Sequence, residues 1–343
     1  MLPSFPACSG PVGHHLLAPL LALVFLLGVV APARALDCPA VHVLPHLEGG
    51  QVLLEGYVNQ GKPRPGTRRR DRVRGLLATP AASAPIVLQV GPTTRPVTLD
   101  EEGAFAVTVP AWTGTATLAV LDPTTTPATT LWTRELALPP APRFLLVSDI
   151  DDTIQVTEVT RRARMVFNSL FRKAENREAV PGTPDAYRFL AAGAHSLGTP
   201  LVVYLSCSPA AMARSLEAFL DHHGFPAGVL CIKHTLTSDG TDPAVHKLKW
   251  LRRLAATYPG RPFLLLGDSG EQDPEIYLEF ARSAAPGTVR AIIIRQVPGR
   301  EGKDRPRLAG LAATLPASGP QLLVWSNPDE LTAALTTLGL QEK

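Results

Sequence analysis

The feature that most constrains the fold is a series of continuous apolar runs in the second half of the chain. These runs are 144–147, 201–205, 229–232, 263–266 and 289–294. Strands that are buried on both faces of a parallel sheet have this composition, whereas strands with one wet face alternate apolar and polar residues. Helical patterns lie between the runs, at 186–197, 210–223, 244–256 and 274–285, and a last run and helix follow at 322–325 and 329–338. The alternation predicts an α/β domain built on a doubly wound parallel sheet.

The first half of the chain has a different pattern, in which short alternating runs are interrupted by Pro, Gly, Thr and Asp. The alternating runs are 51–58, 86–90, 104–109 and 116–120. Strands separated by turn signals such as 100–103 predict a small all-β, sandwich-like domain. A proline-rich stretch at 139–142 separates the two patterns. We therefore expect a sandwich-like domain over 36–140 and the α/β domain over 141–343.

Residues 1–35 have the pattern of a signal peptide. The apolar run from Leu16 to Val30 is shorter than the roughly 20 residues that a spanning helix needs, and small residues stand at Ala33 and Ala35. We expect cleavage after Ala35 and a periplasmic or secreted mature chain. The segment before the apolar run holds no Lys or Arg, so an uncleaved membrane anchor stays open as the alternative.

Charge and cysteine content argue against two other classes of protein. The net charge is only +3, which does not predict nucleic-acid binding. Three cysteines, Cys38, Cys207 and Cys231, follow the predicted signal peptide, and an odd number does not describe a disulfide scaffold. Cys207 and Cys231 lie in apolar settings typical of small core residues, although a bridge between them stays open.

Polar residues follow the predicted strands at the edge where a doubly wound sheet binds its ligands. They are Asp149, Asp151 and Thr153 after the first run, Ser206 after the second, Lys247 in the helix before the fourth, and Asp268 and Asp273 after the fourth. The set suits phosphoryl transfer, which needs a nucleophile, positive charge beside the phosphate and an acid for the leaving oxygen. We expect Mg²⁺ at the site, because a carboxylate and a phosphate monoester repel each other until a cation shields both.

Each of these residues has an expected role. Asp149 is the predicted nucleophile, and Asp151 is the predicted acid that protonates the leaving alkoxide and later takes a proton from water. Ser206 and Lys247 are expected to hold the phosphoryl oxygens, and Thr153 completes the catalytic set.

The remaining acidic residues are candidates for metal binding or for a structural role. Asp268 and Asp273 can supply oxygen ligands, and Asp273 could instead act through water or orient Asp268 or Lys247. We expect a structural role for Asp152, whose side chain points away from the crevice if the segment stays extended.

The order of these residues resembles a known superfamily. Asp149-x-Asp151-x-Thr153, Ser206, Lys247 and Gly267-Asp268-x4-Asp273 are similar to the four motifs of haloacid dehalogenase phosphatases. A narrower resemblance, over 143–297, is to the phosphatidate phosphatase catalytic domain named after the actin patch protein. That resemblance rests on 148–154, 180–182, 204–209, 246–247 and 267–277. Gln296 is a departure, since the family often has Asp there.

The resemblance implies a phosphomonoesterase that forms an aspartyl-phosphate and converts phosphatidate to diacylglycerol and phosphate. It also implies that Mg²⁺ is bound by Asp149, by the Asp151 carbonyl and by Asp268. No residue identifies an acyl chain, so soluble phosphate esters and phosphoproteins stay open as substrates. A non-catalytic surface binding module is the alternative from another class.

Two basic segments could contact an anionic surface. Residues 161–173 combine five cations with five apolar side chains, as a helix at a phospholipid surface would, and a short cap helix is the alternative. Residues 68–74 are expected to form either a solvated loop or a contact with an anionic surface. Lys233 and His234 follow the third run, as a solvated loop or as a substrate contact, and Lys249 is expected to face solvent.

Overall fold

The computed structural model describes residues 35–47, 50–61, 78–138, 141–156, 177–235 and 238–340. Most of the predicted signal peptide and the basic segments 68–74 and 161–173 lie outside the described residues, so the statements about them stay predictions. Ala35–Lys343 form one compact unit that contains both halves, and the boundary at residue 140 also stays a prediction. Among the described residues there is no helix of the length and apolar character needed to cross a membrane.

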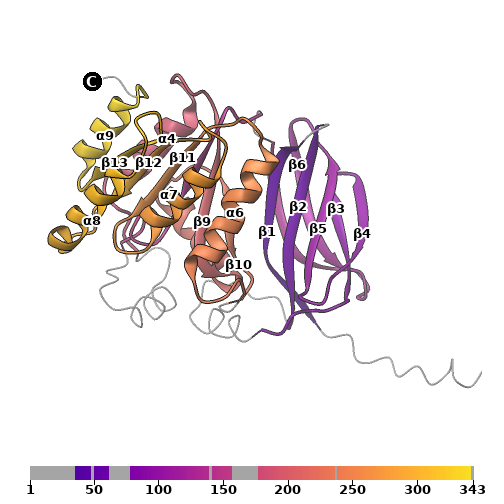
Figure 1. The fold of residues 1–343 in the computed structure, drawn as a ribbon. Helices are drawn as coiled ribbons and strands as arrows, with labels where there is room; N and C mark the ends of the chain where they lie inside the picture. Colours follow the sequence, from indigo (N-terminus) through magenta and orange to yellow (C-terminus); the bar gives the residue numbers. More distant parts are fainter. Residues whose placement is uncertain are drawn as a thin grey trace, which may run out of the picture. The chain divides into compact units, whose positions relative to one another are not determined.

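Antiparallel strands build the described part of the first half (Figure 1). One sheet has the order β1-β2-β5 and another the order β4-β3-β6-β7. The strands are β1 (Leu36–Leu47), β2 (Gln51–Gln60), β3 (Pro85–Val90), β4 (Thr93–Thr98), β5 (Ala104–Pro110), β6 (Thr115–Asp122) and β7 (Thr129–Ala137). The inner faces share one core, to which β2 gives Leu54, β3 gives Leu88 and β6 gives Val120. The predicted all-β arrangement is confirmed.

Three of these strands go beyond the alternation pattern. β4 is an edge strand whose residues are mostly exposed, so it lacks an apolar repeat. β1 contains Pro39 and Pro45, and its register against β2 shifts between Asp37 and Ala40 and again between Leu44 and Leu47. The register shifts accommodate the two prolines, which have no N–H to donate to the ladder. Because the prolines also interrupt the apolar pattern, the sequence does not predict this strand. None of the alternating runs in the sequence corresponds to β7.

A six-stranded parallel sheet forms the second half, in the order β10-β9-β8-β11-β12-β13. The strands are β8 (Phe144–Ser148), β9 (Pro200–Pro209), β10 (Val229–Lys233), β11 (Phe263–Asp268), β12 (Val289–Arg295) and β13 (Gln321–Trp325). The chain builds outward from β8 to β10 on one side and then from β11 to β13 on the other. The carboxyl ends of β8 and β11 therefore lie at a topological switch point, where such sheets bind ligands. The predicted α/β sheet is confirmed.

Helices cover both faces of this sheet. Phe144 and Leu146 of β8 belong to one core with α4 (Thr183–Ala192), α5 (Ala213–His222) and α9 (Pro328–Thr337). Leu145 and Val147 belong to the other core, with α6 (Pro243–Thr257), α7 (Asp273–Ser283) and α8 (Glu301–Ala313). A short 3₁₀ helix, η2 (Ala210–Met212), precedes α5. Successive β8 residues thus enter opposite cores, which explains why the run is apolar throughout.

Two helices differ from the sequence pattern. α4 spans 183–192 rather than 186–197, because Gly182 and Gly193 flank it in the left-handed conformation (φ 82° and 70°). α8 has no counterpart in the prediction, since Pro306 lies inside it and few of its side chains are buried.

Strands of the first half contact the α/β half through paired polar groups. Asp37 of β1 accepts a hydrogen bond from Arg214 of α5 at 3.3 Å, and Glu55 of β2 pairs with Arg253 of α6. The cysteines among the described residues, Cys38, Cys207 and Cys231, are free. The open possibility of a bridge between Cys207 and Cys231 is therefore not realised. Cys231 is a buried core residue, as predicted, whereas Cys207 is only partly buried.

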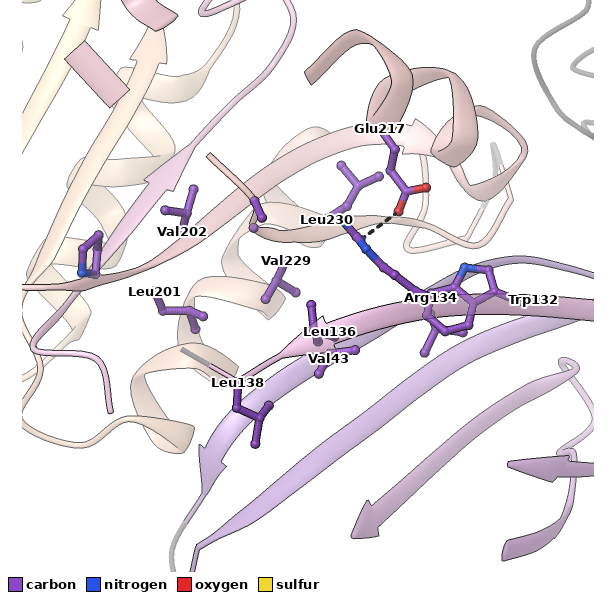
Figure 2. A pocket seen from close by; sticks show the side chains of 14 residues that line it. Val43, Trp132, Arg134, Leu136, Leu138, Leu201, Val202, Glu217, Val229 and Leu230 are labelled. Atoms are coloured by element: carbon purple, nitrogen blue, oxygen red, sulfur yellow. Dashed lines mark hydrogen bonds and ion pairs between the residues drawn. The ribbon is translucent and has the colours of Figure 1, made fainter. Parts of the chain in front are cut away.

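An apolar cavity of about 160 Å³ lies among β1, β7, β9 and β10 (Figure 2). Val43 and Trp132 line it from the first half, and Leu201 and Val229 from the second. An ion pair between Arg134 and Glu217 (3.5 Å) lies beside it. Leu201 and Val229 stand at the starts of their strands, so this cavity lies away from the carboxyl edge where the candidate site is expected.

Candidate active site

Asp149 directly follows the central strand β8. Its backbone N–H donates to the Leu266 carbonyl of β11 at 2.9 Å, which holds the start of the loop against the neighbouring strand. The chain then turns back, because the Ile154 N–H donates to the Ile150 carbonyl at 3.0 Å. The turn brings the Thr153 hydroxyl within 3.3 Å of Asp149 Oδ2. Thr153 can therefore orient the carboxylate of Asp149.

This turn corrects the expectation that Asp152 lies on an extended segment. Asp152 has a φ of 52°, in the left-handed region, so the side-chain direction expected for a strand does not apply. Its carbonyl accepts a hydrogen bond from Arg295 Nη1 of β12 at 2.6 Å, and its side chain is buried. These contacts fix the turn that follows Asp149.

Lys247 connects two of the carboxylates. The buried ammonium donates to Asp149 Oδ1 at 2.9 Å and to Asp273 Oδ1. Its helix, α6, begins where Asp242 caps the Ala244 N–H at 2.9 Å, which places Lys247 in the second turn. Burial alone would lower the pKa of Lys247, but the carboxylates of Asp149 and Asp273 hold it well above its usual value. Lys247 is therefore a permanent cation beside Asp149.

Asp149, Asp268 and Asp273 form a buried acidic cluster. One carboxylate oxygen from each lies within 4.8 Å of the others. Asp268 Oδ1 accepts from the Gly270 N–H at 2.5 Å and from the Glu271 N–H at 3.2 Å. Asp268 Oδ2 is buried and has no hydrogen-bond partner among the described residues. The cluster therefore offers a free oxygen ligand.

The charges in this cluster do not balance. Three buried carboxylates lie together, and the ammonium of Lys247 pairs with two of them, Asp149 and Asp273. Burial raises the pKa of Asp149, with Lys247 opposing the effect, and burial together with Asp273 raises that of Asp268. A further cation would stabilise all three carboxylates at once, so the cluster could hold a metal ion.

Asp273 lies at the first position of α7 and approaches the sheet closely. Its Oδ2 accepts the Asp268 N–H at 3.3 Å, in addition to the contact of Oδ1 with Lys247. A Cβ on Gly267 would lie 2.6 Å from the Asp273 Cβ, so only glycine fits at that position of β11. Asp273 thus orients both Asp268 and Lys247, and direct metal ligation by Asp273 stays a prediction.

Asp151 has the electrostatic setting of an acid that works near neutral pH. Burial raises its pKa to about 7, and the nearby charges of Glu271 and Asp152 add to the effect. A carboxylic acid with this pKa is partly protonated at neutral pH and can both give and accept a proton. The backbone carbonyl of Asp151 as a metal ligand stays a prediction.

Ser206 lies on β9, next to the central strand. β8 and β9 pair as far as Ser148 and Tyr204, so Ser206 stands just beyond the pairing, as Asp149 does. Ser206 is buried, and its hydroxyl accepts the Ser208 N–H at 3.1 Å. The structure thus places it at the same edge as the acidic cluster, and its phosphoryl contact stays a prediction.

The residues at the end of β10 and directly after it differ in part from expectation. Lys233 is buried and donates to the Gly240 carbonyl at 2.8 Å, so a solvated position is wrong for this side chain. His234 stacks on Tyr57 with ring centroids 4.2 Å apart. Lys249 is 56% exposed, which agrees with its predicted position on the outer face of the helix.

Three contacts around the site are not predicted by the sequence pattern. The buried Tyr187 of α4 lies 2.6 Å, hydroxyl to hydroxyl, from Ser148, the residue before Asp149. The Ser148 hydroxyl also lies 2.6 Å from the Asp149 carbonyl. Gln296, the departure noted above, uses its amide to donate to the Ser269 hydroxyl at 3.2 Å. The only related features of the sequence are the place of Tyr187 in a predicted helix and the presence of Gln at 296, where the family often has Asp.

Comparison with known proteins agrees with this geometry. Residues 144–296 match the family model described as the catalytic domain of phosphatidate phosphatase APP1. Over these residues the chain is similar to the APP1 catalytic-domain family. The match runs from the first residue of β8 to the residue after β12, so the APP1 segment includes the whole acidic cluster and Lys247.

The relatives of the APP1 segment are fungal. It is 31% identical over 154 residues to phosphatidate phosphatase APP1 of Saccharomyces cerevisiae, and 28% identical over 156 residues to an uncharacterized protein of Schizosaccharomyces pombe. Each alignment covers 44% of this chain and 25% of the relative, so the chain aligns with about a quarter of the length of either. A β-glucuronidase of Ruminococcus gnavus matches at 9% identity with a TM-score of 0.27, covering 85% of this chain and 62% of that one, which is too weak to carry an argument.

Proposed function

We propose that this protein is an exported, Mg²⁺-dependent phosphomonoesterase that acts through an aspartyl-phosphate and uses phosphatidate as its substrate. The observation that carries the proposal is the buried Asp149 at the end of the central strand, hydrogen-bonded to Lys247 and clustered with Asp268 and Asp273. Similarity of residues 144–296 to the APP1 catalytic-domain family supports phosphatidate as the substrate. The pattern of residues 1–35 supports export.

Mg²⁺ suits the donors of the cluster. Asp149, Asp268 and Asp273 offer the hard oxygen ligands that Mg²⁺ prefers, and ligands around one Mg²⁺ at about 2.1 Å lie roughly 3–4 Å apart. Asp268 Oδ2, which is buried and unpartnered among the described residues, is a preformed ligand. When bound, the ion would neutralise phosphate charge and so reduce its repulsion from Asp149.

The reaction can be written with the residues of this chain. A carboxylate oxygen of Asp149 forms a bond to phosphorus while the bond from phosphorus to the glyceryl oxygen breaks. Asp151 gives its proton to the departing alkoxide, which leaves as diacylglycerol. A water molecule then attacks phosphorus, Asp151 takes the proton of that water, and phosphate leaves with Asp149 restored. Lys247 stabilises negative charge beside Asp149 in both steps.

The first test is turnover by the full chain and by Asp149→Asn. We expect Mg²⁺-dependent phosphate release from an aryl phosphate, abolished by a chelator, and a loss of at least about 1000-fold in Asp149→Asn because the amide cannot attack phosphorus. Asp185→Asn is the matched control, since Asp185 is 84% exposed on α4. A wild type without Mg²⁺-dependent turnover would remove the enzyme proposal and leave a binding module.

The substrate needs its own test. Initial rates should be compared for phosphatidate in phosphatidylcholine vesicles, glycerol 3-phosphate and a phosphoserine peptide. We expect kcat/KM for phosphatidate to be higher by at least about tenfold, a difference of about 1.4 kcal/mol in transition-state free energy. A preference for either soluble ester would replace the lipid in the proposal and leave the phosphatase mechanism standing.

Export is tested at the amino terminus of the protein from its own host. Amino-terminal sequencing of the mature chain should begin at Leu36 if cleavage follows Ala35. A chain that keeps residues 1–35 and sediments with membranes would favour an anchor over a cleaved signal.

A further inference from the structure

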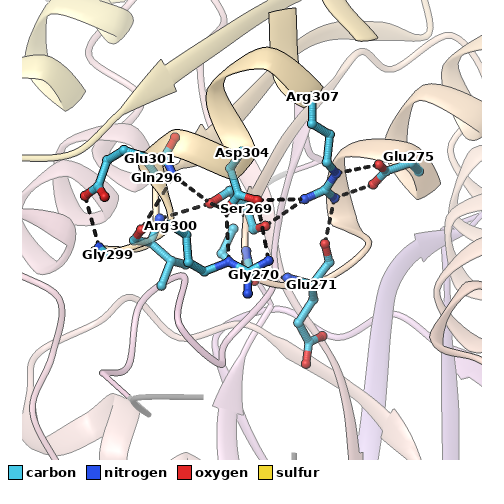
Figure 3. A network of polar contacts seen from close by, with 12 residues as sticks. Ser269, Gly270, Glu271, Glu275, Gln296, Gly299, Arg300, Glu301, Asp304 and Arg307 are labelled. Carbon is cyan, nitrogen blue, oxygen red and sulfur yellow. Dashed lines mark hydrogen bonds and ion pairs between the residues drawn. The ribbon is translucent and has the colours of Figure 1, made fainter. Parts of the chain in front are cut away.

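The loop between β11 and α7 is held by one arginine of α8 (Figure 3). Arg307 donates from Nη1 to the Ser269 carbonyl and from Nη2 to the Glu271 carbonyl, both at 2.8 Å. The same guanidinium binds the Glu275 carboxylate through Nε at 2.7 Å and through Nη2 at 2.6 Å. Arg307 therefore ties the loop backbone to the first turn of α7. A guanidinium has the planar fork that this set of acceptors needs.

The Ser269 side chain makes a second connection to α8. Its buried hydroxyl donates to Asp304 Oδ2 at 2.8 Å and lies 3.0 Å from the Val297 N–H and 3.2 Å from Gln296 Nε2. A hydroxyl has one proton to donate and two lone pairs, so these three contacts use its full capacity. Asp304 is fully buried, and Arg300 and Arg307 pair with its carboxylate at 3.0 and 3.5 Å. The contacts with Asp304, Val297 and Gln296 therefore fix the position of the Ser269 side chain.

This loop sets the orientation of the Asp268 carboxylate. The N–H groups of Gly270 and Glu271 both point at Asp268 Oδ1, and Oδ2 is left buried without a hydrogen-bond partner among the described residues. A Cβ on Gly270 would lie 2.8 Å from Asp268 Oδ1, so the backbone approaches that oxygen more closely than other residues allow. A shift of the loop would rotate the carboxylate and move Oδ2.

We propose that Asp304 and Arg307 are positioning residues for the cation site. They hold the Ser269–Glu271 backbone so that Asp268 presents its free oxygen to the metal. Both lie beyond residue 296, outside the segment that matches the family model, so this support comes from a part of the chain that the family match does not include. The inference rests on the proposed Mg²⁺-dependent function.

The test is the affinity for Mg²⁺, measured without substrate. Isothermal titration calorimetry with Mg²⁺ alone should give a Kd for the full wild-type chain, for Asp304→Asn and for Arg307→Lys. We expect Kd to rise by about 10-fold or more in both variants, since partners that orient metal ligands usually contribute on this scale. Arg307→Lys keeps the positive charge and removes the fork, so it reports geometry rather than net charge.

A matched control lies on the same pair of helices. Arg282 of α7 donates to Thr314, at the end of α8, at 2.5 Å, and Arg282→Ala removes a contact between these helices far along both from the loop. This variant should keep the wild-type Kd for Mg²⁺. Melting temperatures without metal should be recorded for every variant, because a purely structural role lowers them and leaves Kd unchanged.

The outcomes separate the two proposals. A Kd within twofold of wild type in both variants, with a lower melting temperature, would overturn the positioning role alone. A wild type that binds no Mg²⁺ would overturn the positioning role together with the proposed function. If Asp304→Asn does not fold, Arg307→Lys and Ser269→Ala decide the question by the same measurement. Activity that returns at high Mg²⁺ in Arg307→Lys would support the role, because it places the defect in binding.

Discussion

The two halves of the molecule bury charged groups in different ways. In the first half, two buried acids each pair with a base of the second half, Asp37 with Arg214 and Glu55 with Arg253, and a third, Asp122, accepts hydrogen bonds from Thr124. At the carboxyl edge of the parallel sheet, three buried carboxylates lie together, and Lys247 pairs with two of them. A buried carboxylate that is paired has its charge compensated, whereas a group of buried carboxylates in excess of its cations would be stabilised by a further cation. Charge balance thus distinguishes Asp37 and Glu55 from the acidic cluster.

Among the changes that test this comparison, the largest effect should come from removing the ammonium of Lys247. Lys247→Met leaves Asp149 and Asp273 without their cation, and we expect kcat/KM to fall by about 100- to 1000-fold. We also expect a loss of about 3–5 kcal/mol in the free energy of unfolding, since breaking a buried pair strands the partner charge. Steady-state kinetics and urea unfolding check the two effects.

The control for that change is two residues away. Lys249→Met removes an exposed lysine from the same helix and should leave kcat/KM unchanged. Equal losses in the two variants would show that any lysine of α6 matters and would break the comparison.

A smaller effect is expected from His42, a buried neutral group of the first half. Its ring packs at 5.4 Å from that of Trp250 on α6, and its pKa is lowered to about 4, mainly by burial and also by Arg253 and His246. The unfolded chain then binds a proton below the usual pKa of 6.5 before the folded chain does. Stability is therefore full above pH 6.5 and falls as the pH drops toward 4, by about 2–3 kcal/mol from this residue.

His42→Phe isolates that contribution, because the ring remains and the titration is removed. Urea unfolding at several pH values between 7 and 4 should show a shallower loss of stability in the variant than in the wild type. Parallel curves would assign the acid sensitivity to other groups.

The smallest effect should follow from unbalancing one structural pair. Asp37→Asn weakens the contact with Arg214, which keeps its hydrogen bond to the Cys38 carbonyl at 2.9 Å. We expect a loss of about 1–2 kcal/mol in unfolding free energy and no change in kcat/KM. A change in kcat/KM would mean that the first half contributes to the site, and the distinction between the halves would then have to be redrawn.

The sequence predicts the parallel sheet well because both faces of its strands are buried. Every residue of β8 is buried, so the run is apolar throughout, and the site residues follow strands that the topology brings together. β1 is not predicted because its prolines interrupt the alternation of apolar and polar residues. β4 is not predicted because most of its residues are exposed. The order of the strands therefore also predicts that Asp149, Lys247, Asp268 and Asp273 lie at the carboxyl edge of the sheet.

The support from α8 could not be predicted in this way. Ser269 and Asp304 are 35 residues apart, and their contact depends on how α8 packs beside the loop. Because Pro306 lies inside α8, the sequence pattern does not predict this helix. No residue spacing in the sequence predicts that a serine contacts an aspartate of another element. The left-handed turn at Asp152 could not be predicted either, because aspartate adopts that conformation only occasionally and does not mark it as glycine does.

The central position of β8 has a consequence for how the site comes into existence. β8 is the first strand of its sheet in sequence, and its neighbours β9 and β11 follow later in the chain, with Asp268 at the end of β11 and Asp273 at the start of α7. A chain that ends before residue 268 holds Asp149 but neither of the acids that accompany it. The three carboxylates come together only when β11 and the start of α7 have docked beside β8. Metal binding would therefore report on the docking of these distant segments, and a fragment that ends before residue 268 would lack two of the three carboxylates.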